Sequence, residues 1–508
     1  MPLSALLAAL SLAAGGGSGA ALCDGVAGIA VPDLRIVKAT PVAAGSGFAA
    51  PDARAGKVEV GFCRIEGVIE KEIGFELWLP LEKEWNGHLL TGGVGGQAGS
   101  FNYRELARGV SRGYAGASTD TGHKASDPHW LLGDPQRAVN YAERANHLLA
   151  VKAKAAIAGF YGRPVRRAIF SGCSGGGRQA MTEAQRYPGD YDGILAGAPG
   201  VNTPQMSARR MWEMILHRRH AGLMSAADWT LVARSGTAKC DGDDGVQDGL
   251  VANPAACRFD VGELLCKPGS TRPCLSAPQV DLARRIYAPL HDEHGKPIDT
   301  GILPGVPVSA TPLPEPFTPG PPYLAVSLFG DGVHRDPNWN AADFRIADDL
   351  PAIDRVMNLH ADDPDLSAFR ARGGKLLLYQ GWADPLVLAQ STTRYFEAVR
   401  ARMGEVSRFL RLYMVPGMDH CVGGAGPDLF GATGGEGLDR APGHDMLSAL
   451  EHWLDTGTAP GSILSVRREN GKVTATRPLC PYPQAAHYRG TGDPRQAASF
   501  ICRLPVGK

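Results

Sequence analysis

The sequence AIFSGCSGGG covers residues 168–177 and joins a short apolar run to a cluster of small residues around Ser174. Within it, Gly172 to Gly176 fits the pattern G-x-S-x-G, in which a sharp turn between a strand and a helix exposes the serine hydroxyl. Glycines on both sides of the serine tolerate the strained backbone of such a turn. The pattern predicts Ser174 as a nucleophile, although a glycine-rich chain contains such matches by chance as well.

A serine nucleophile requires an imidazole base and a carboxylate that orients the base, and two later turns offer these groups. Asp384 lies in QGWADP after the apolar run 375–379, and His420 lies in PGMDHC after the run 409–414. The alternative for a lone Asp before Pro is an ordinary turn residue, and the alternative for a lone His is an ordinary surface residue. The chain order Ser, Asp, His, with all three at the ends of predicted strands, favours a triad of Ser174, Asp384 and His420.

Two cysteines flank the predicted triad, because Cys173 precedes the serine and Cys421 follows the histidine. If Ser174 and His420 lie within hydrogen-bond distance, a disulfide between these cysteines is feasible. The alternative is a buried Cys173 thiol with Cys421 paired elsewhere. The ten cysteines include no CxxC pair and have no histidine at zinc-finger spacing, so five disulfides are favoured over a metal–thiolate site.

Apolar runs alternate with helical stretches over much of the chain, which predicts an α/β fold with a mostly parallel sheet flanked by helices. The pattern stops between residues 201 and 365, where Pro-rich, Gly-rich and cysteine-bearing segments predict an inserted domain. We therefore expect a catalytic domain made of residues 22–200 and 366–508, with the insertion between its two parts. The expected strands are 87–91, 113–118, 167–170, 375–379 and 409–414, and the long expected helix is 141–160.

The composition is that of a globular protein without affinity for nucleic acid or an anionic membrane, because 52 basic residues balance 52 acidic residues among 508. Residues 1–21 combine an apolar stretch with small residues, which predicts a signal peptide too short to span a membrane. This segment contains no Lys or Arg, and Leu22 before Cys23 argues against a lipid anchor. We expect a secreted or periplasmic protein without a membrane anchor.

Acyl transfer also needs two backbone N–H groups that face the developing oxyanion. Gly175, directly after the nucleophile, is expected to supply one of them. The second is expected from the glycine turn GGVGGQ at residues 92–97, where Gly95 or Gly96 is the candidate. A plain flexible loop is the alternative for this turn.

The stretch DGDDGVQDGL at residues 241–250 gathers carboxylates in a glycine-rich loop, a pattern typical of a site for a hard cation such as Ca²⁺. It is not an EF-hand, because Ala252 occupies the twelfth position, where a bidentate Glu is required. A solvated acidic turn is the alternative. The position of the loop in the predicted insertion, next to Cys240, favours a structural ion over a catalytic one.

Together these motifs resemble the tannase and feruloyl esterase family of secreted serine hydrolases, over nearly all of the expected mature chain. Six segments carry the resemblance: GCSGGGRQA at 172–180, YDGILAGAP at 191–199, CDGDDGVQDGL at 240–250, QGWADP at 380–385, PGMDHCVGG at 416–424 and TRPLCPYPQ at 476–484. It implies an α/β-hydrolase fold with a lid inserted between nucleophile and acid, the triad given above and a disulfide between Cys173 and Cys421. It also implies structural Ca²⁺, bound by the side chains of Asp241, Asp244 and Asp248 and the carbonyls of Val246 and Leu250.

Members of this family hydrolyse esters of phenolic acids, so the resemblance implies a carboxylic ester hydrolase for small-molecule aromatic esters, feruloyl or galloyl, that works through an acyl-enzyme without an organic cofactor. One branch cleaves mono(2-hydroxyethyl) terephthalate, but Val387 stands where that branch has phenylalanine and argues against this activity. A serine peptidase on the same fold would need the same triad, whereas a non-catalytic calcium-dependent binding protein would need only the calcium loop. The candidates to line the lid pocket, which are also ordinary core residues, are Trp212, Tyr323, Phe329, Trp339 and Phe344.

Overall fold

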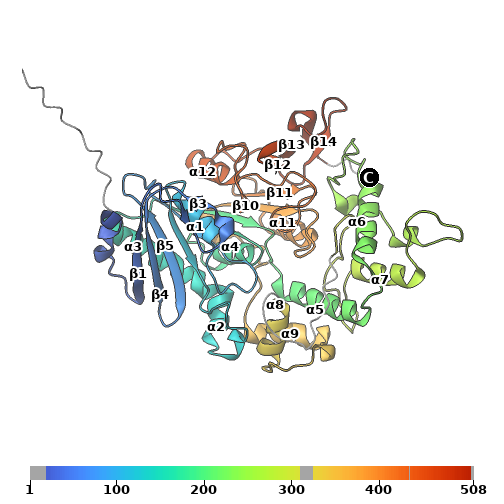
Figure 1. Ribbon diagram of the computed structural model, residues 1–508, viewed down its shortest axis with the longest axis horizontal. Helices are drawn as coiled ribbons and strands as arrows, with labels where there is room; N and C mark the ends of the chain where they lie inside the picture. Colours follow the sequence, from blue (N-terminus) through green and yellow to red (C-terminus); the bar gives the residue numbers. More distant parts are fainter. Residues whose placement is uncertain (1–18, 309–323, 434, 505–508) are drawn as a thin grey trace, which may run out of the picture.

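The computed structural model describes residues 19–308, 324–433 and 435–504, so residues 1–18 of the predicted signal peptide lie outside the described residues. Within these ranges the core is a nine-stranded sheet in the order β1-β4-β5-β7-β6-β8-β9-β10-β11 (Figure 1). From β7 onward in this order the strands are parallel, and β1, β4 and β5 add an antiparallel edge, so the predicted α/β class with a mostly parallel sheet is confirmed. The strands are β1 (Leu34–Val42), β4 (Phe62–Ile69), β5 (Ile73–Pro80), β6 (His88–Gly92), β7 (Ala115–Thr119), β8 (Arg167–Cys173), β9 (Gly193–Gly197), β10 (Lys375–Gly381) and β11 (Leu410–Val415).

The central strands are buried on both faces, because alternate side chains pack under helices on opposite sides of the sheet. Leu376 and Leu378 of β10 lie in the hydrophobic cluster that also contains side chains of α3, α4 and α11. Leu377 and Tyr379, one residue out of step, lie in the cluster that contains α12 on the other face. The helices are α1 (Tyr103–Val110), which packs on β6 and β7, α3 (Ala145–Tyr161), α4 (Gly175–Arg186), α11 (Ala389–Met403) and α12 (Met446–Thr456).

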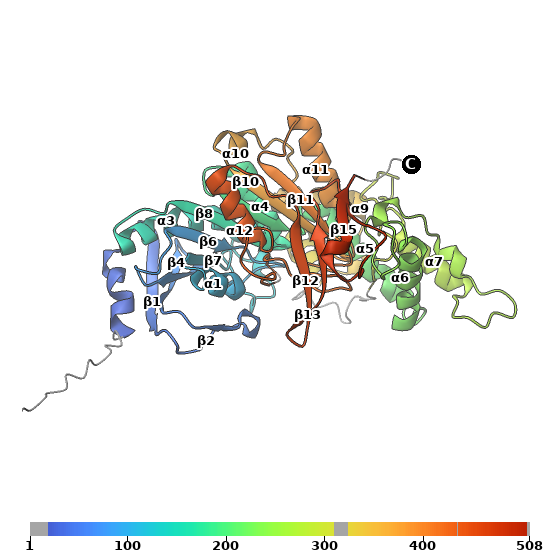
Figure 2. The same cartoon turned by 90° about the horizontal axis from the view of Figure 1, so that it is seen from above.

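The chain between β9 and β10 forms a helical insertion that, over the residues described, adds no strand to the central sheet. Its helices α6 and α7 lie at the end of the molecule opposite β1 in both views (Figures 1 and 2). Met211 and Phe329 of the insertion share a hydrophobic cluster with Trp130 and Tyr141, which precede β8. The helices are α5 (Thr203–Arg219), α6 (Ala226–Cys240), α7 (Ala277–Tyr287), α8 (Leu324–Ser327), α9 (Ile346–Val356) and α10 (Ser367–Ala371).

The long helix predicted over residues 141–160 is interrupted near its start. It begins as α2 (Gln136–Val139), passes through a π-helical turn η4 (Asn140–Arg144) and continues as α3. The π-helical turn coincides with an outside donor, because the Arg178 guanidinium donates hydrogen bonds to the carbonyls of Tyr141 and Ala142. Such turns are frequent at functional sites, and here the turn carries Tyr141 toward the glycine loop after β6.

Smaller elements complete the fold. The last part of the chain forms two hairpins, β12 (Ile463–Glu469) with β13 (Lys472–Leu479) and β14 (Ala485–Tyr488) with β15 (Phe500–Arg503). β2 (Phe48–Ala49) pairs with β3 (Lys57–Val58) near the N-terminal edge. The remaining turns of helix are η1 (Gly19–Gly28), η2 (Ala53–Ala55), η3 (Trp130–Leu132), η5 (Pro254–Ala256), η6 (Val261–Leu264), η7 (Leu328–Val333), η8 (Ala341–Asp343) and η9 (Ala497–Ser499).

Every cysteine of the chain is paired, as the even cysteine count favours. Two of the five disulfides lie within the insertion, and one joins the two C-terminal hairpins. The pairs are Cys23–Cys63, Cys173–Cys421, Cys240–Cys257, Cys266–Cys274 and Cys480–Cys502. In the part of the chain that the structure describes, no helix is both long and apolar enough to cross a lipid bilayer.

Candidate active site

Ser174 occupies the turn between β8 and α4, with φ 62° and ψ −123°. A positive φ is strained for a residue with a side chain, and the surrounding glycines allow the turn to be this tight. A Cβ atom on Gly172 would lie 2.5 Å from the carbonyl oxygen of Gly176, and one on Gly177 would lie 2.3 Å from that of Gly197. Close backbone contacts therefore require glycine at positions 172 and 177, and the turn holds Ser174 at the carboxyl edge of the parallel strands.

Asp384 follows β10, and its carboxylate is buried, with 1% of the residue exposed. Its Oδ1 accepts hydrogen bonds from the backbone N–H groups of Leu386 and Val387 at 2.8 and 2.9 Å. Its Oδ2 accepts from Gln380 Nε2 at 3.0 Å and from His420 Nδ1 at 2.8 Å. The carboxylate thus has donors on both oxygens, and one of them is the predicted base.

His420 follows β11, and its side chain is 19% exposed. Because Nδ1 donates to Asp384, Nε2 is the ring nitrogen that can accept a proton from another group. The backbone N–H of His420 donates to the carboxylate of the preceding Asp419 at 2.7 Å, and burial raises the pKa of Asp419. His420 is therefore fixed through its ring and through its main chain.

The disulfide Cys173–Cys421 joins the two halves of the site, with 6.0 Å between the Cα atoms. It links the residue before Ser174 to the residue after His420. The three predicted catalytic residues follow β8, β10 and β11. These strands lie within four neighbouring strands of the sheet. His420 is bonded to Asp384, and the disulfide holds the residue next to Ser174 against the residue next to His420, so all three turns lie at one edge of the sheet.

The glycine loop after β6 lies directly beside the serine turn. A Cβ on Gly175 would lie 3.1 Å from the backbone nitrogen of Gly96, and a Cβ on Gly95 would lie 3.8 Å from the Ser174 Cβ. Gly175 is the first residue of α4, so its N–H has no partner within the helix. The N–H groups predicted to bind the oxyanion therefore come from two neighbouring segments, the serine turn and the glycine loop after β6.

The acidic loop of residues 241–250 is bonded internally and to a distant arginine. One carboxylate oxygen of Asp241 accepts from the N–H groups of Asp248, Gly249 and Leu250 at 2.9–3.2 Å. The Arg477 guanidinium of β13 forms ion pairs with the buried Asp244, at 3.3 Å, and with Asp248. Despite this arginine, burial raises the pKa of Asp244 to about 6.

The donor chemistry of this loop, carboxylate and carbonyl oxygens only, fits Ca²⁺. The side chains of the loop do not form a ready-made ligand cluster. Within residues 19–308, 324–433 and 435–504 there is no group of three or more His, Cys, Asp or Glu side chains that could hold a metal ion. Arg477 supplies part of the positive charge that Asp244 and Asp248 require. Calcium at this loop remains a prediction.

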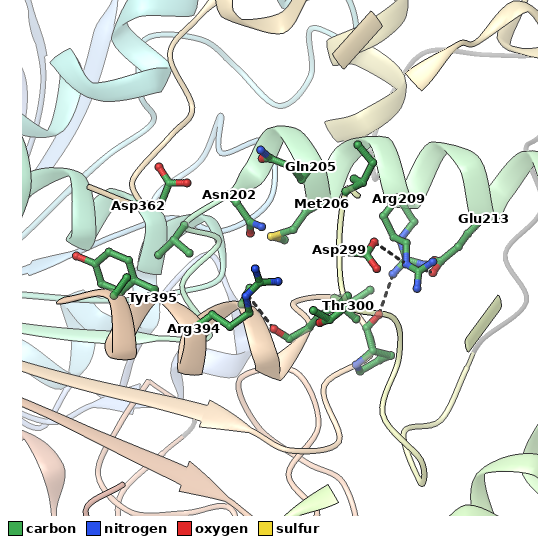
Figure 3. Close-up of a pocket in the computed structure, with 18 residues that line it drawn as sticks. Asn202, Gln205, Met206, Arg209, Glu213, Asp299, Thr300, Asp362, Arg394 and Tyr395 are labelled. Carbon is green, nitrogen blue, oxygen red and sulfur yellow. Dashed lines mark hydrogen bonds and ion pairs between the residues drawn. The ribbon is translucent and has the colours of Figure 1, made fainter. Parts of the chain in front are cut away.

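Two of the cavities lie between the insertion and the turn that carries Asp384. The first, of about 320 Å³, is bounded by α5, α11 and the turn after Asp384. In Figure 3 the side chains of Asn202 and Arg394 point into it, and the buried Arg209 pairs with Glu213 and Asp299 at one end. The second, of about 460 Å³, has mainly apolar lining and reaches Ala383 and Asp419, the residues directly before the predicted acid and base.

The aromatic residues predicted to line the lid pocket have mostly structural roles. Phe329 and Phe344 contact each other in the hydrophobic cluster of the insertion, and Trp339 stacks on His334 in the same region. Trp212 is half-buried, with the Arg209 guanidinium over its ring, and Tyr323 lies outside the described residues. None of the four described aromatic residues lines either of the two cavities.

Sequence reasoning missed several polar residues that support the site. Gln380 is a polar residue in the otherwise apolar run LLLYQG. This break in the apolar pattern could have indicated a residue that supports the site. Gln179, Tyr141 and Arg477 gave no such signal, because their partners are distant in the sequence. All four side chains are buried and hydrogen-bonded.

Comparisons with known sequences identify the family of the chain. The tannase and feruloyl esterase family matches residues 57–313 and 327–503. An uncharacterised esterase from Xanthomonas campestris pv. campestris is 35% identical, covering 96% of this chain and 92% of that protein. A probable feruloyl esterase B-1 from Aspergillus flavus is 29% identical, covering 94% and 95%.

Comparison with solved structures finds the same kind of relative. The crystal structure of feruloyl esterase B from Aspergillus oryzae has a TM-score of 0.87 at 25% identity, covering 96% of this chain and all of that chain. Tannin acyl hydrolase from Aspergillus niger, at 19% identity and a TM-score of 0.75 over 94% of each chain, shares the fold. The expected α/β-hydrolase fold is confirmed. The chain belongs to the tannase and feruloyl esterase family and is an esterase of the serine hydrolase type.

Proposed function

We propose that this protein is a secreted carboxylic ester hydrolase for esters of phenolic acids, with Ser174 as the nucleophile, His420 as the base and Asp384 as the acid that orients the base. The observation that carries the proposal is the disulfide Cys173–Cys421. It joins the residue before the turn serine to the residue after a histidine whose ring is bonded to a buried carboxylate. A serine beside an oriented imidazole is what acyl transfer requires.

The reaction follows from these positions. Ser174 Oγ attacks the ester carbonyl carbon while His420 Nε2 takes its proton, and the new oxyanion is stabilised by the N–H groups of Gly175 and of Gly95 or Gly96. When the bond to the alcohol breaks, the alcohol oxygen takes the proton from His420, and an acyl-enzyme remains. Water then attacks the acyl carbon as His420 takes its proton. The acid leaves as that proton passes to Ser174.

The aromatic acyl group is proposed from the relatives, two of which are named feruloyl esterases. The cavity of about 460 Å³ that reaches Ala383 and Asp419 has mainly apolar lining, which suits a flat ring because burial of such a ring is favourable. A terephthalate monoester is less favoured as a substrate, because Val387 is aliphatic, is 1% exposed and uses its backbone to hold Asp384.

Secretion and calcium binding are part of the proposal. Secretion is supported by the complete pairing of the ten cysteines, because disulfides persist in oxidising compartments. For Ca²⁺ we propose the side chains of Asp241, Asp244 and Asp248 and the carbonyls of Val246 and Leu250 as ligands, which the oxygen-only donor set supports. This ion would stabilise the insertion and would supply no group to the reaction.

The function is tested by comparing the wild type with Ser174→Ala on methyl ferulate, methyl gallate and ethyl butyrate. The wild type should have a higher kcat/KM for the two aromatic esters than for the aliphatic ester. Ser174→Ala should lose several orders of magnitude in kcat on all three at an unchanged melting temperature, because a triad without its nucleophile loses most of its rate enhancement.

The matched control is Ser171→Ala, which removes a buried hydroxyl three residues earlier in β8. It should retain activity. Activity of Ser174→Ala within tenfold of the wild type would refute the nucleophile. A strong preference for the aliphatic ester would refute the aromatic substrate and leave the triad standing.

A further inference from the structure

The glycine loop after β6 is held by a side chain of the helix that begins at the serine turn. Gln179 of α4 is 2% exposed, and its Oε1 accepts the backbone N–H of Val94 at 2.9 Å. Its Nε2 donates to the carbonyl of the same residue at 3.1 Å. One amide side chain therefore pairs with both main-chain groups of the central loop residue, as a neighbouring strand would.

A second side chain holds the far end of the loop. The Tyr141 hydroxyl donates to the Gly96 carbonyl at 2.8 Å, and the residue is 1% exposed. The π-helical turn that carries Tyr141 is in turn bonded by Arg178, which precedes Gln179 in α4. Consecutive residues of α4 thus hold the loop, one directly and one through Tyr141.

These bonds determine where the loop's N–H groups point. In a trans peptide the C=O and N–H groups lie on opposite sides, so fixing a carbonyl fixes the N–H of the following residue. Gln179 fixes the Val94 carbonyl and hence the N–H of Gly95. The N–H of Gly96 is fixed by the Ala98 N–H, which donates to the Gly95 carbonyl at 3.0 Å. Tyr141 fixes the Gly96 carbonyl and hence the N–H of Gln97, the next peptide of the loop. Tyr141 therefore acts on the Gly96 N–H through the adjoining peptide, because it restrains rotation of the Gly96 backbone from the far side.

Without such bonds the loop would be mobile, because four of its residues from 92 to 96 are glycines with wide conformational freedom. An oxyanion is stabilised efficiently only by donors that are already in place. The helix α4 also starts with Gly175, the other predicted donor. We propose that Gln179 and Tyr141 are positioning residues that hold the Gly95–Gly96 amides in register with Gly175 for the transition state.

This inference rests on the proposed function and is tested with Tyr141→Phe, which removes one hydroxyl. Because a hydrogen bond of this kind contributes about 1 kcal/mol, we expect kcat to fall about fivefold. KM should stay within about twofold of the wild type, because the change acts on transition-state stabilisation. The control is Tyr161→Phe, which removes a buried hydroxyl bonded to the Pro80 carbonyl at 2.7 Å, far from the loop.

A second readout separates positioning from a structural effect. Phenylboronic acid binds serine hydrolases when the serine oxygen adds to boron, and the resulting tetrahedral anion places an oxygen at the oxyanion donors. Tyr141→Phe should weaken inhibition by phenylboronic acid about fivefold and leave inhibition by the product ferulate unchanged. Gln179→Met, which removes both bonds to Val94, should weaken boronate inhibition further, while a melting temperature reports whether it folds.

The outcomes are distinguishable. If Tyr141→Phe matches Tyr161→Phe in kcat and in boronate inhibition, the positioning role is refuted. Equal weakening of boronate and ferulate inhibition would also refute it, because both would then report a distorted pocket. If Ser174→Ala retains activity, the proposed function fails as well; if Ser174→Ala is inactive, only the positioning role is lost.

Discussion

At the residue scale, Asp384 shows how the fold specifies one orientation of an imidazole. Its two oxygens accept four hydrogen bonds, two from backbone N–H groups, one from Gln380 and one from His420. Gln380 is itself oriented, because the buried Thr392 hydroxyl donates to its Oε1 at 2.9 Å. The amide therefore presents its NH₂ group to the carboxylate, and the His420 ring cannot turn without breaking the set.

This geometry predicts the effect of Asp384→Asn. The variant should lose about 10⁴-fold in kcat, because an amide can donate to His420 Nδ1 and favour the wrong tautomer. Asp419→Asn is the matched change, since Asp419 contacts the backbone N–H of His420 and not its ring. It should lose far less activity on the same ester. Equal losses in the two variants would contradict the assignment of Asp384 as the orienting acid.

The sequence predicted the residues that carry local motifs and missed those whose partners are distant. Ser174, Asp384 and His420 follow strands in short patterns, so the order of residues was sufficient to predict them as a triad. Tyr141 is 45 positions from Gly96, and Gln179 is 85 positions from Val94. No local pattern encodes such contacts, because they depend on how elements pack.

At the element scale, the acidic loop connects the insertion to the C-terminal hairpins. Asp244 and Asp248 pair with Arg477 of β13, and the Tyr488 N–H of β14 donates to the Asp244 carbonyl at 2.9 Å. The sequence indicated the loop as a cation site from its carboxylates. It could not indicate the arginine, which lies 233 residues from Asp244.

Calcium removal tests this element. If the loop binds Ca²⁺ in the folded state only, a chelator should lower the melting temperature of the wild type, and added Ca²⁺ should restore it. Asp241→Asn should lower the melting temperature and abolish the response to the chelator. Asp243→Asn, an exposed carboxylate of the same loop, should keep the response. Absence of calcium by elemental analysis, with an unchanged melting curve, would contradict the site.

At the scale of the whole molecule, the parallel sheet was predictable and the interior of the insertion was not. Parallel strands that are buried on both faces appear in the sequence as apolar runs, such as Leu376–Leu378. Successive side chains of such a run lie on alternate faces of the sheet. The insertion alternates helices with long irregular segments, and its aromatic residues show no repeating spacing that separates core positions from pocket positions. Phe329 and Phe344 were therefore candidates for the pocket and are core residues in the structure.

Two buried histidines predict how the stability of the whole molecule responds to acid. Burial lowers the pKa of His123, beside the glycine loop, and of His217, in α5, to about 4 in each case. In the unfolded chain these groups titrate near their ordinary pKa of about 6.5. Between these pH values the unfolded state binds more protons than the folded state, so the free energy of unfolding should fall as the pH is lowered from about 6.5 to 4.

The contribution of one histidine can be isolated with His217→Phe, because the His217 ring is buried and packs edge-on against Trp229. Denaturant unfolding across this pH range should give a shallower fall for the variant than for the wild type, since phenylalanine binds no proton. The matched change is His452→Phe at an exposed histidine. Its free energy of unfolding should fall with pH as steeply as that of the wild type. Parallel curves for His217→Phe and the wild type would mean that the acid sensitivity of the fold comes from other groups. A shallower curve for His217→Phe alone would assign part of it to the packing of α5 on α6.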